Sequence, residues 1–139
     1  MNQLRVFSLI IFVFCMTAGF AQSSKKIVQK GISVVKTSEM RIDDGDKEYW
    51  IDEIEYYDNR GNLIEYKEYS DKGDDLKKWI KYKYDTNSNL IEEIELNEKG
   101  EQKERIVTIY KDDLKIERHY YDDRDRLYKK KKYEYEFRS

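Results

Sequence analysis

Apolar and polar residues alternate along much of the chain, which is the pattern of a β-strand with one covered face and one exposed face. In residues 76–84, one predicted face carries Leu76, Ile80, Tyr82 and Tyr84, and the other carries Lys77, Lys81 and Lys83. Near the C-terminus, Tyr133, Tyr135 and Phe137 alternate with Glu134 and Glu136. These segments are rich in Tyr, Ile, Val and Trp, which favour strands. An earlier strand is predicted within residues 31–42.

Clusters of Asp, Asn and Gly interrupt this alternation at regular intervals. From Asp58 onward they begin at positions 58, 71, 85, 97, 111 and 122. The intervals are too short for helices with connections, whereas short loops join neighbouring strands as antiparallel hairpins. Hairpin turns are predicted at residues 59–61, 72–73 and 99–100. The predicted fold is all-β, an antiparallel meander of about eight strands built from repeated hairpins. It forms a curved single sheet or a partly wrapped barrel.

The first 21 residues have the layout of a secretory signal peptide. One cation, Arg5, precedes an apolar run, and the small residues Gly19 and Ala21 precede Gln22. The run is shorter than the ~20 residues that cross a bilayer, so cleavage after Ala21 is predicted, with no transmembrane segment left afterwards. The predicted divisions are a signal peptide in residues 1–21, a flexible tether in 22–30 and a β-hairpin repeat domain in 31–139. The expected location is secreted or periplasmic.

Charge and cysteine content narrow the range of functions. The chain has 27 Lys and Arg against 29 Asp and Glu, and cleavage would remove one cation, which leaves 26 against 29. This near balance gives no sign of nucleic-acid binding. The single cysteine, Cys15, lies in the predicted signal peptide. The mature chain is therefore expected to lack disulfides, a thiol nucleophile and cysteine-based metal sites.

Three turns share one motif, in which a Tyr precedes an Asp and a Leu follows five residues after that Asp. The motif reads Tyr57-Asp58-Asn-Arg-Gly61-Asn62-Leu63 in its full form, and Ser88 and Asp125 replace the glycine in the other two copies. The motif resembles the tyrosine–aspartate (YD, or RHS-type) repeat of short secreted Bacteroidetes proteins and of giant toxin shells. That resemblance implies a progressively curling sheet and no catalytic residue, and the lost glycines suggest relaxed turns. The MORN-like repeat of certain antitoxins is the alternative resemblance.

The residues that could carry chemistry are few and scattered. The only histidine, His119, lies in the middle of a predicted strand, without the surroundings that a catalytic triad requires. The acidic residues 43–48 lack the spacing of a calcium loop, and the four lysines of residues 129–132 are typical of a solvated sheet edge. We therefore expect no catalytic site, no metal site and no cofactor.

Aromatic residues are the most distinctive feature, with 13 Tyr and two Trp. Their spacing fits packing across a sheet face, and exposed rings also make rigid contacts for sugars or proteins. The candidate ligand-binding residues are Trp50, Trp79, Tyr82 and Tyr120. The expected function is a non-enzymatic binding or structural module that acts through its sheet surface on a protein or a cell-envelope glycan. The alternatives are a glycan-binding module that stacks Tyr and Trp on sugars, and an antitoxin or immunity protein.

Overall fold

The computed structural model describes residues 24–42 and 48–138, so the predicted signal peptide lies outside the described residues. One short helix precedes eight strands. The elements are α1 (Ser24–Lys30), β1 (Val34–Glu39), β2 (Trp50–Tyr57), β3 (Leu63–Tyr69), β4 (Leu76–Tyr84), β5 (Leu90–Leu96), β6 (Gln102–Lys111), β7 (Leu114–Tyr121) and β8 (Leu127–Lys132), with a 3-10 turn at Asp71–Gly73. Among these residues, no helix is long and apolar enough to cross a membrane.

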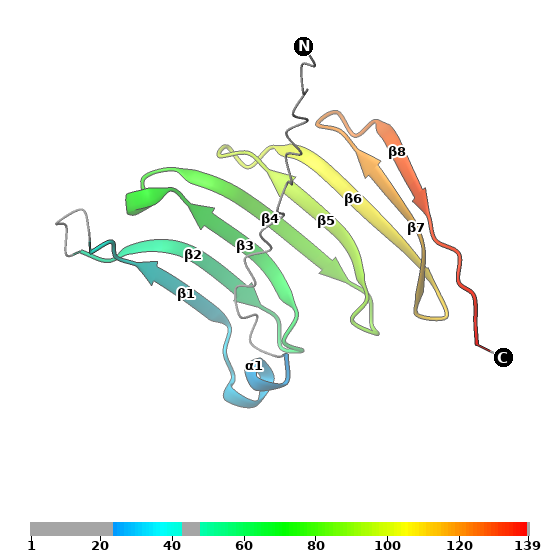
Figure 1. Cartoon of the computed structure of the whole chain (residues 1–139), viewed down its shortest axis with the longest axis horizontal. Coiled ribbons are helices and arrows are strands. Elements are labelled where there is room, and N and C mark those ends of the chain that lie inside the picture. The colour runs from blue at the N-terminus through cyan, green and yellow to red at the C-terminus, as the bar shows by residue number, and fades with distance from the viewer. Residues whose placement is uncertain (1–23, 43–47, 139) are drawn as a thin grey trace, which may run out of the picture.

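The strands form one antiparallel sheet in chain order, from β1 at one edge to β8 at the other. Figure 1 shows a single twisted, curved layer with both edges open. The predicted all-β meander of eight strands is thus confirmed as an open sheet, and it does not wrap into a barrel. A single layer buries little, and Ile27, Ile54, Tyr57 and Tyr120 are the buried hydrophobic residues of the described chain.

Every hairpin contains one β-bulge, always in its second strand. The extra residues are Asp52, Ile64, Lys77, Ile91, Lys103, Ile116 and Tyr128. A bulge bends its strand and increases the local twist. Because the bulges recur at equivalent places, their bends act repeatedly along the sheet and account for its curvature.

Four turns use the same hydrogen bonds, beginning at Asp58, Asp85, Asn97 and Asp122. In each, the first side chain accepts bonds from the backbone amides two and four residues later, at 2.8–3.0 Å. The fourth residue has a positive φ, which is 64° at Ser88 and 60° at Asp125. The expectation that these two turns are relaxed is therefore wrong, because both keep the left-handed conformation and bonds of the glycine-containing turns. The predicted turns at residues 59–61, 72–73 and 99–100 are confirmed.

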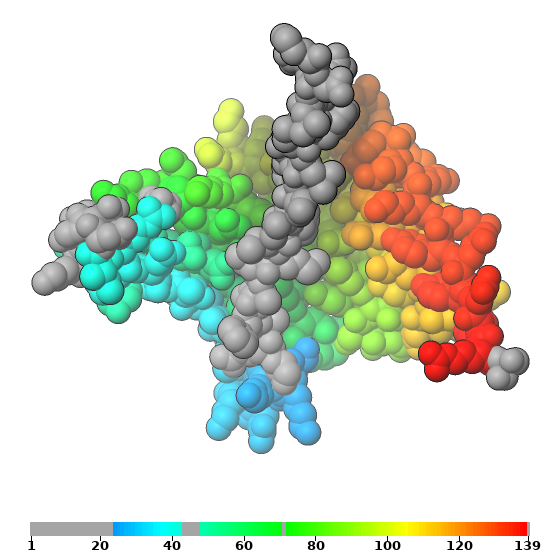
Figure 2. Space-filling model, viewed as in Figure 1, coloured from blue at the N-terminus to red at the C-terminus, as the bar shows by residue number. Residues whose placement is uncertain are grey.

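Helix α1 occupies residues that the sequence predicted to be a flexible tether. Ile27 is fully buried, and the Ser24 carbonyl oxygen would lie 2.5 Å from a Cβ placed on Gly61. The helix is therefore docked on the β2–β3 turn, and Figures 1 and 2 show it projecting at that end of the sheet. Gly31, which follows it with a φ of 62°, donates its amide to the Val28 carbonyl and closes the helix.

Two details of the predicted strands are wrong. Leu76 does not share a face with Ile80, Tyr82 and Tyr84, because the bulge at Lys77 shifts it to the opposite face. The last strand ends at Lys132, before the predicted alternation of Tyr133, Tyr135 and Phe137. The Tyr133 amide still donates to the Ile116 carbonyl at 3.0 Å, but the partner strand β7 begins only two residues earlier, at Leu114.

Candidate functional site

Strand register divides the aromatic residues between two faces of the sheet. We call one the tyrosine face, and its tyrosines are Tyr57, Tyr66, Tyr82, Tyr84, Tyr110 and Tyr120. We call the other the Trp79 face, and it carries Ile54, Trp79, Ile94, Leu96 and Val107 in its middle. The candidates Tyr82 and Tyr120 therefore lie on one face, and Trp79 lies on the other.

Tyr82 and Tyr120 are held within the structure of the tyrosine face. Burial, together with the nearby carboxylate of Glu93, raises the pKa of Tyr82 to about 12. Tyr120 is 6% exposed, and its ring lies beneath Lys129, whose ammonium nitrogen is 3.8 Å from the ring centroid. A ring that is covered by a cation and almost fully buried is poorly placed to receive a ligand.

Other tyrosines of this face tie one hairpin to the next. The hydroxyls of Tyr84 and Tyr110 donate to the backbone carbonyls of Leu63 and Leu90, and Tyr135, in the segment after β8, donates in the same way to the carbonyl of Lys115. Each bond spans 20 or 21 residues and uses a carbonyl near the start of an earlier strand. Packing and hydrogen bonding therefore account for much of the tyrosine content.

Trp50 lies at the start of β2, against the turn that precedes β4. A Cβ added to Gly73 would be 3.7 Å from the Trp50 Cβ. The Trp50 indole nitrogen is buried, and no hydrogen-bond partner for it is found in the described part of the chain. Register places Trp50 on the tyrosine face, near the β3–β4 turn, and it does not line the pocket beside Trp79.

Trp79 is partly buried and firmly oriented. Its indole nitrogen donates to a Glu65 carboxylate oxygen at 2.7 Å. The ammonium groups of Lys67 and Lys81 lie 4.5 and 5.4 Å from its ring centroid, within the range of cation–π attraction. On another side, ring atoms would be 3.5 and 3.6 Å from a Cβ placed on Gly100. These contacts fix the indole in one orientation before any ligand arrives.

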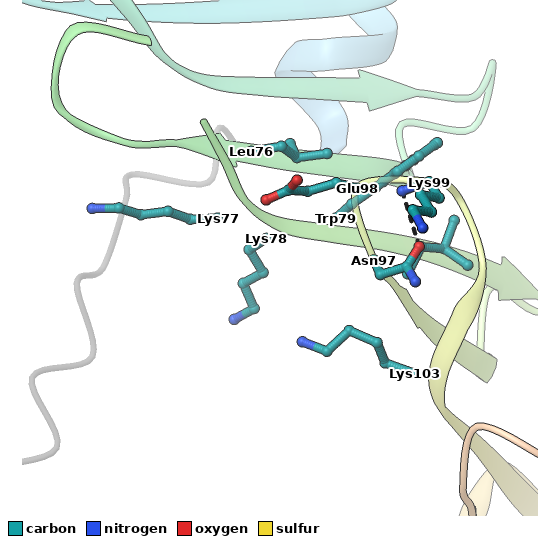
Figure 3. Close-up of a pocket in the computed structure, with 9 residues that line it drawn as sticks. Leu76, Lys77, Lys78, Trp79, Asn97, Glu98, Lys99 and Lys103 are labelled. Atoms are coloured by element: carbon teal, nitrogen blue, oxygen red, sulfur yellow. Dashed lines mark hydrogen bonds between the residues drawn. The ribbon is translucent and has the colours of Figure 1, made fainter. Parts of the chain in front are cut away.

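A pocket of about 280 Å³ lies beside Trp79, where β4 and β6 begin and β5 ends. Its partly buried lining residues are Leu76, Trp79, Leu96 and Asn97, and its exposed ones are Lys77, Lys78, Glu98, Lys99 and Lys103. Figure 3 shows Lys77, Lys78 and Lys103 extending away from the strands into open space. An oriented indole, two leucines and four lysines thus meet at one end of the sheet.

In the next pair of hairpins an arginine stands at the position of Trp79, and a tyrosine stands at the position of Leu96. Trp79 pairs with Leu96 before the Asn97 turn, and Arg105 pairs with Tyr121 before the Asp122 turn. Arg105 there binds Asp125, at 2.6 Å, which takes the place that Gly100 has beside Trp79. The same strand register is therefore formed with an arginine–aspartate pair, so an indole facing a glycine is not a requirement of the sheet.

His119 and the acidic residues form no reactive cluster. The Nε2 atom of His119 lies 2.6 Å from a Glu117 carboxylate oxygen on the same strand. Within residues 24–42 and 48–138, no group of three or more His, Cys, Asp or Glu side chains is arranged to hold a metal ion. Residues 43–47, which make up most of the acidic stretch considered for calcium, lie outside the described residues.

Comparison with known family models, curated proteins and solved structures found no match to this chain.

Proposed function

We propose that this chain is an exported, non-enzymatic binding module that contacts a glycan of the cell envelope through the pocket beside Trp79. The observation that carries the proposal is the oriented, partly exposed indole at a position where the next hairpin pair has a closed ion pair. Planar aromatic rings with fixed orientation provide contact area at low entropic cost, which suits the apolar faces of sugar rings. Export is proposed from the signal-peptide layout of residues 1–21.

The proposed module is built from YD-type repeats. Support comes from the four turns that share one set of hydrogen bonds, although only three of them carry the Tyr-Asp-…-Leu motif. On this view the repeats form the scaffold, and the residues that differ between repeats determine what is bound. Trp79 and Gly100 are such residues, since Arg105 and Asp125 replace them one hairpin pair later.

The test compares the unaltered protein with two variants, Trp79→Ala and Tyr128→Ala. Tyr128 is 54% exposed on β8, so it serves as a matched aromatic control away from the pocket. Each immobilised protein is incubated with polysaccharide from the native cell envelope, washed, and analysed for retained sugar. The unaltered protein and Tyr128→Ala should retain saccharide, and Trp79→Ala should lose it.

Stability measurements separate a lost contact from a lost fold. Because Trp79 is partly exposed, its truncation should cost less than the ~3–5 kcal/mol expected of a fully buried aromatic residue. Circular dichroism should therefore show a folded Trp79→Ala variant. Equal retention of saccharide by all three proteins, or retention by none, would rule out the proposed site.

A further inference from the structure

We propose that the pocket beside Trp79 binds a negatively charged sugar unit, such as a uronic acid residue of an acidic polysaccharide. This inference rests on the proposed glycan-binding function and specifies its ligand class. The pocket is lined by four lysines and one glutamate, whereas the whole chain has a net charge of −2. A locally positive site on a net negative chain favours an anionic ligand.

The lysines are available to a ligand. Lys103 forms an ion pair with Glu95, but no ion pair or hydrogen bond of the Lys77, Lys78 or Lys99 ammonium group is found within the described residues. All three are exposed. Lys77 is the bulged residue of the β3–β4 hairpin, and Lys103 is its counterpart in the β5–β6 hairpin. Bulges re-aim side chains, and here they bring two equivalent lysines to one pocket.

The neighbouring hairpin pair again provides an internal comparison. Residues 76–79 and 97–100 around Trp79 carry three cations and one anion, which is a net charge of +2. The register-equivalent residues 102–105 and 122–125 carry three cations and four anions, which is a net charge of −1. Of these two equivalent places at the same end of the sheet, the one with the open pocket is therefore the positive one.

The size of the pocket limits how much of the ligand it holds. At about 280 Å³ it lies just below the ~300–1,000 Å³ typical of small-molecule sites. It would thus receive one small part of a chain, with the sugar ring against the indole and its carboxylate toward the lysines at the open side of the pocket. The rest of a polysaccharide would lie outside the pocket.

The test is titration of the protein with a short oligogalacturonate and with the same oligosaccharide after methyl esterification, which removes its charge. We expect the acid to bind at least about tenfold more tightly than the ester, and its binding to weaken as NaCl rises from about 0.05 to 0.5 M because salt screens exposed charges. Lys77→Gln and Lys99→Gln should each weaken binding about two- to fivefold, the range of a single exposed charge pair. Lys111→Gln, at the opposite end of the sheet, should have no effect.

The outcomes distinguish this inference from the proposed function. Equal binding of acid and ester, with loss of both in Trp79→Ala, would overturn the charge preference and leave glycan binding intact. Equal binding of oligogalacturonate and poly-glutamate would show attraction to any polyanion and overturn a sugar-specific site. A sulfated oligosaccharide that binds more tightly than the uronate would assign the lysines to sulfate. Absence of binding to every acidic oligosaccharide would overturn the inference.

Discussion

Replacement of Gly61 by alanine should show how strongly helix α1 is held against the sheet. Gly61 has a φ of 76°, and an added Cβ would lie 2.5 Å from the Ser24 carbonyl oxygen and 3.1 Å from two further Ser24 backbone atoms. Real Cβ atoms do not approach backbone this closely, and a helix backbone cannot rotate out of the way as a side chain can. The variant must therefore displace α1 or distort the turn.

The expected loss has two parts. An alanine at positive φ costs about 1–2 kcal/mol, of which ~0.4–1 kcal/mol is offset because alanine restricts the unfolded chain. Displacement of α1 would also expose Ile27, which is fully buried, and burial of such a side chain contributes ~1.5–3 kcal/mol. Gly61→Ala should thus lose about 2–4 kcal/mol of unfolding free energy. Gly100→Ala has the same kind of turn and a φ of 80° but only ordinary contacts, so it should lose ~1 kcal/mol.

Urea unfolding, followed by far-ultraviolet circular dichroism, measures the loss of unfolding free energy in both variants. The dependence of this free energy on urea concentration should be the same in both variants and in the unaltered protein, so that the midpoints can be compared directly. A second measurement follows α1 directly, because its lysines Lys25, Lys26 and Lys30 are sites for trypsin. Cleavage there should be faster in Gly61→Ala and unchanged in Gly100→Ala. If the two variants lose equal stability and are cleaved at equal rates, α1 is not docked on Gly61 and the reasoning is refuted.

Three further predictions concern acid stability, metal ions and processing. Partial burial raises the pKa of Asp58, but hydrogen bonds from Asn62 and Arg60 outweigh it and lower that pKa. The ionised Asp58 carboxylate therefore stabilises the fold above pH ~4, and this stabilisation is lost as the pH falls through the lowered pKa of the folded state. Asp58→Asn keeps a hydrogen-bond acceptor at this position, as in the Asn97 turn. Urea unfolding should show that the variant loses less unfolding free energy than the unaltered protein between pH 5 and pH 2, and an equal loss in both proteins would contradict this. Thermal melts with EDTA and with excess calcium should coincide, because a filled metal site would raise the melting temperature. Amino-terminal sequencing of exported protein should begin at Gln22, and a start at Met1 would disprove cleavage.

The strands and turns were predictable because their signals are local. Alternating apolar residues mark the strands, and Asp, Asn and Gly mark the places where the backbone needs positive φ or a side-chain acceptor. These signals fixed the number of strands and their order along the chain. The turn at Asn97 has the same hydrogen bonds as the Asp turns, although it lacks the Tyr that precedes each of them and so does not match the sequence motif.

The features that sequence did not predict depend on contacts between distant residues. Helix α1 has Ile27 and Val28 as its only apolar residues, too few for a helical pattern, and its position depends on the bare backbone of Gly61. The bulges have no characteristic residue type that could mark them in the sequence, since the extra residue is an aspartate, an isoleucine, a lysine or a tyrosine. Leu76 was therefore assigned to the wrong face.

The candidate site was predicted only in part, for the same reason. Aromatic content identified Trp79, but it equally suggested Trp50 and Tyr120, which the structure places in packed positions. What separates Trp79 from them is the pocket formed with the Asn97 turn and the lysines around it. That arrangement exists only once the β3–β4 and β5–β6 hairpins lie next to each other, so no short stretch of sequence contains it.

The sheet order also determines how the molecule can be assembled. Each strand pairs only with the strands immediately before and after it in the chain, so contacts are local in sequence, which favours rapid folding. A chain that emerges with its amino end first can complete each hairpin as soon as the second strand of that hairpin has emerged. No strand has to insert between two that are already paired, and a hairpin added or lost at the β8 end would change only the edge of the sheet.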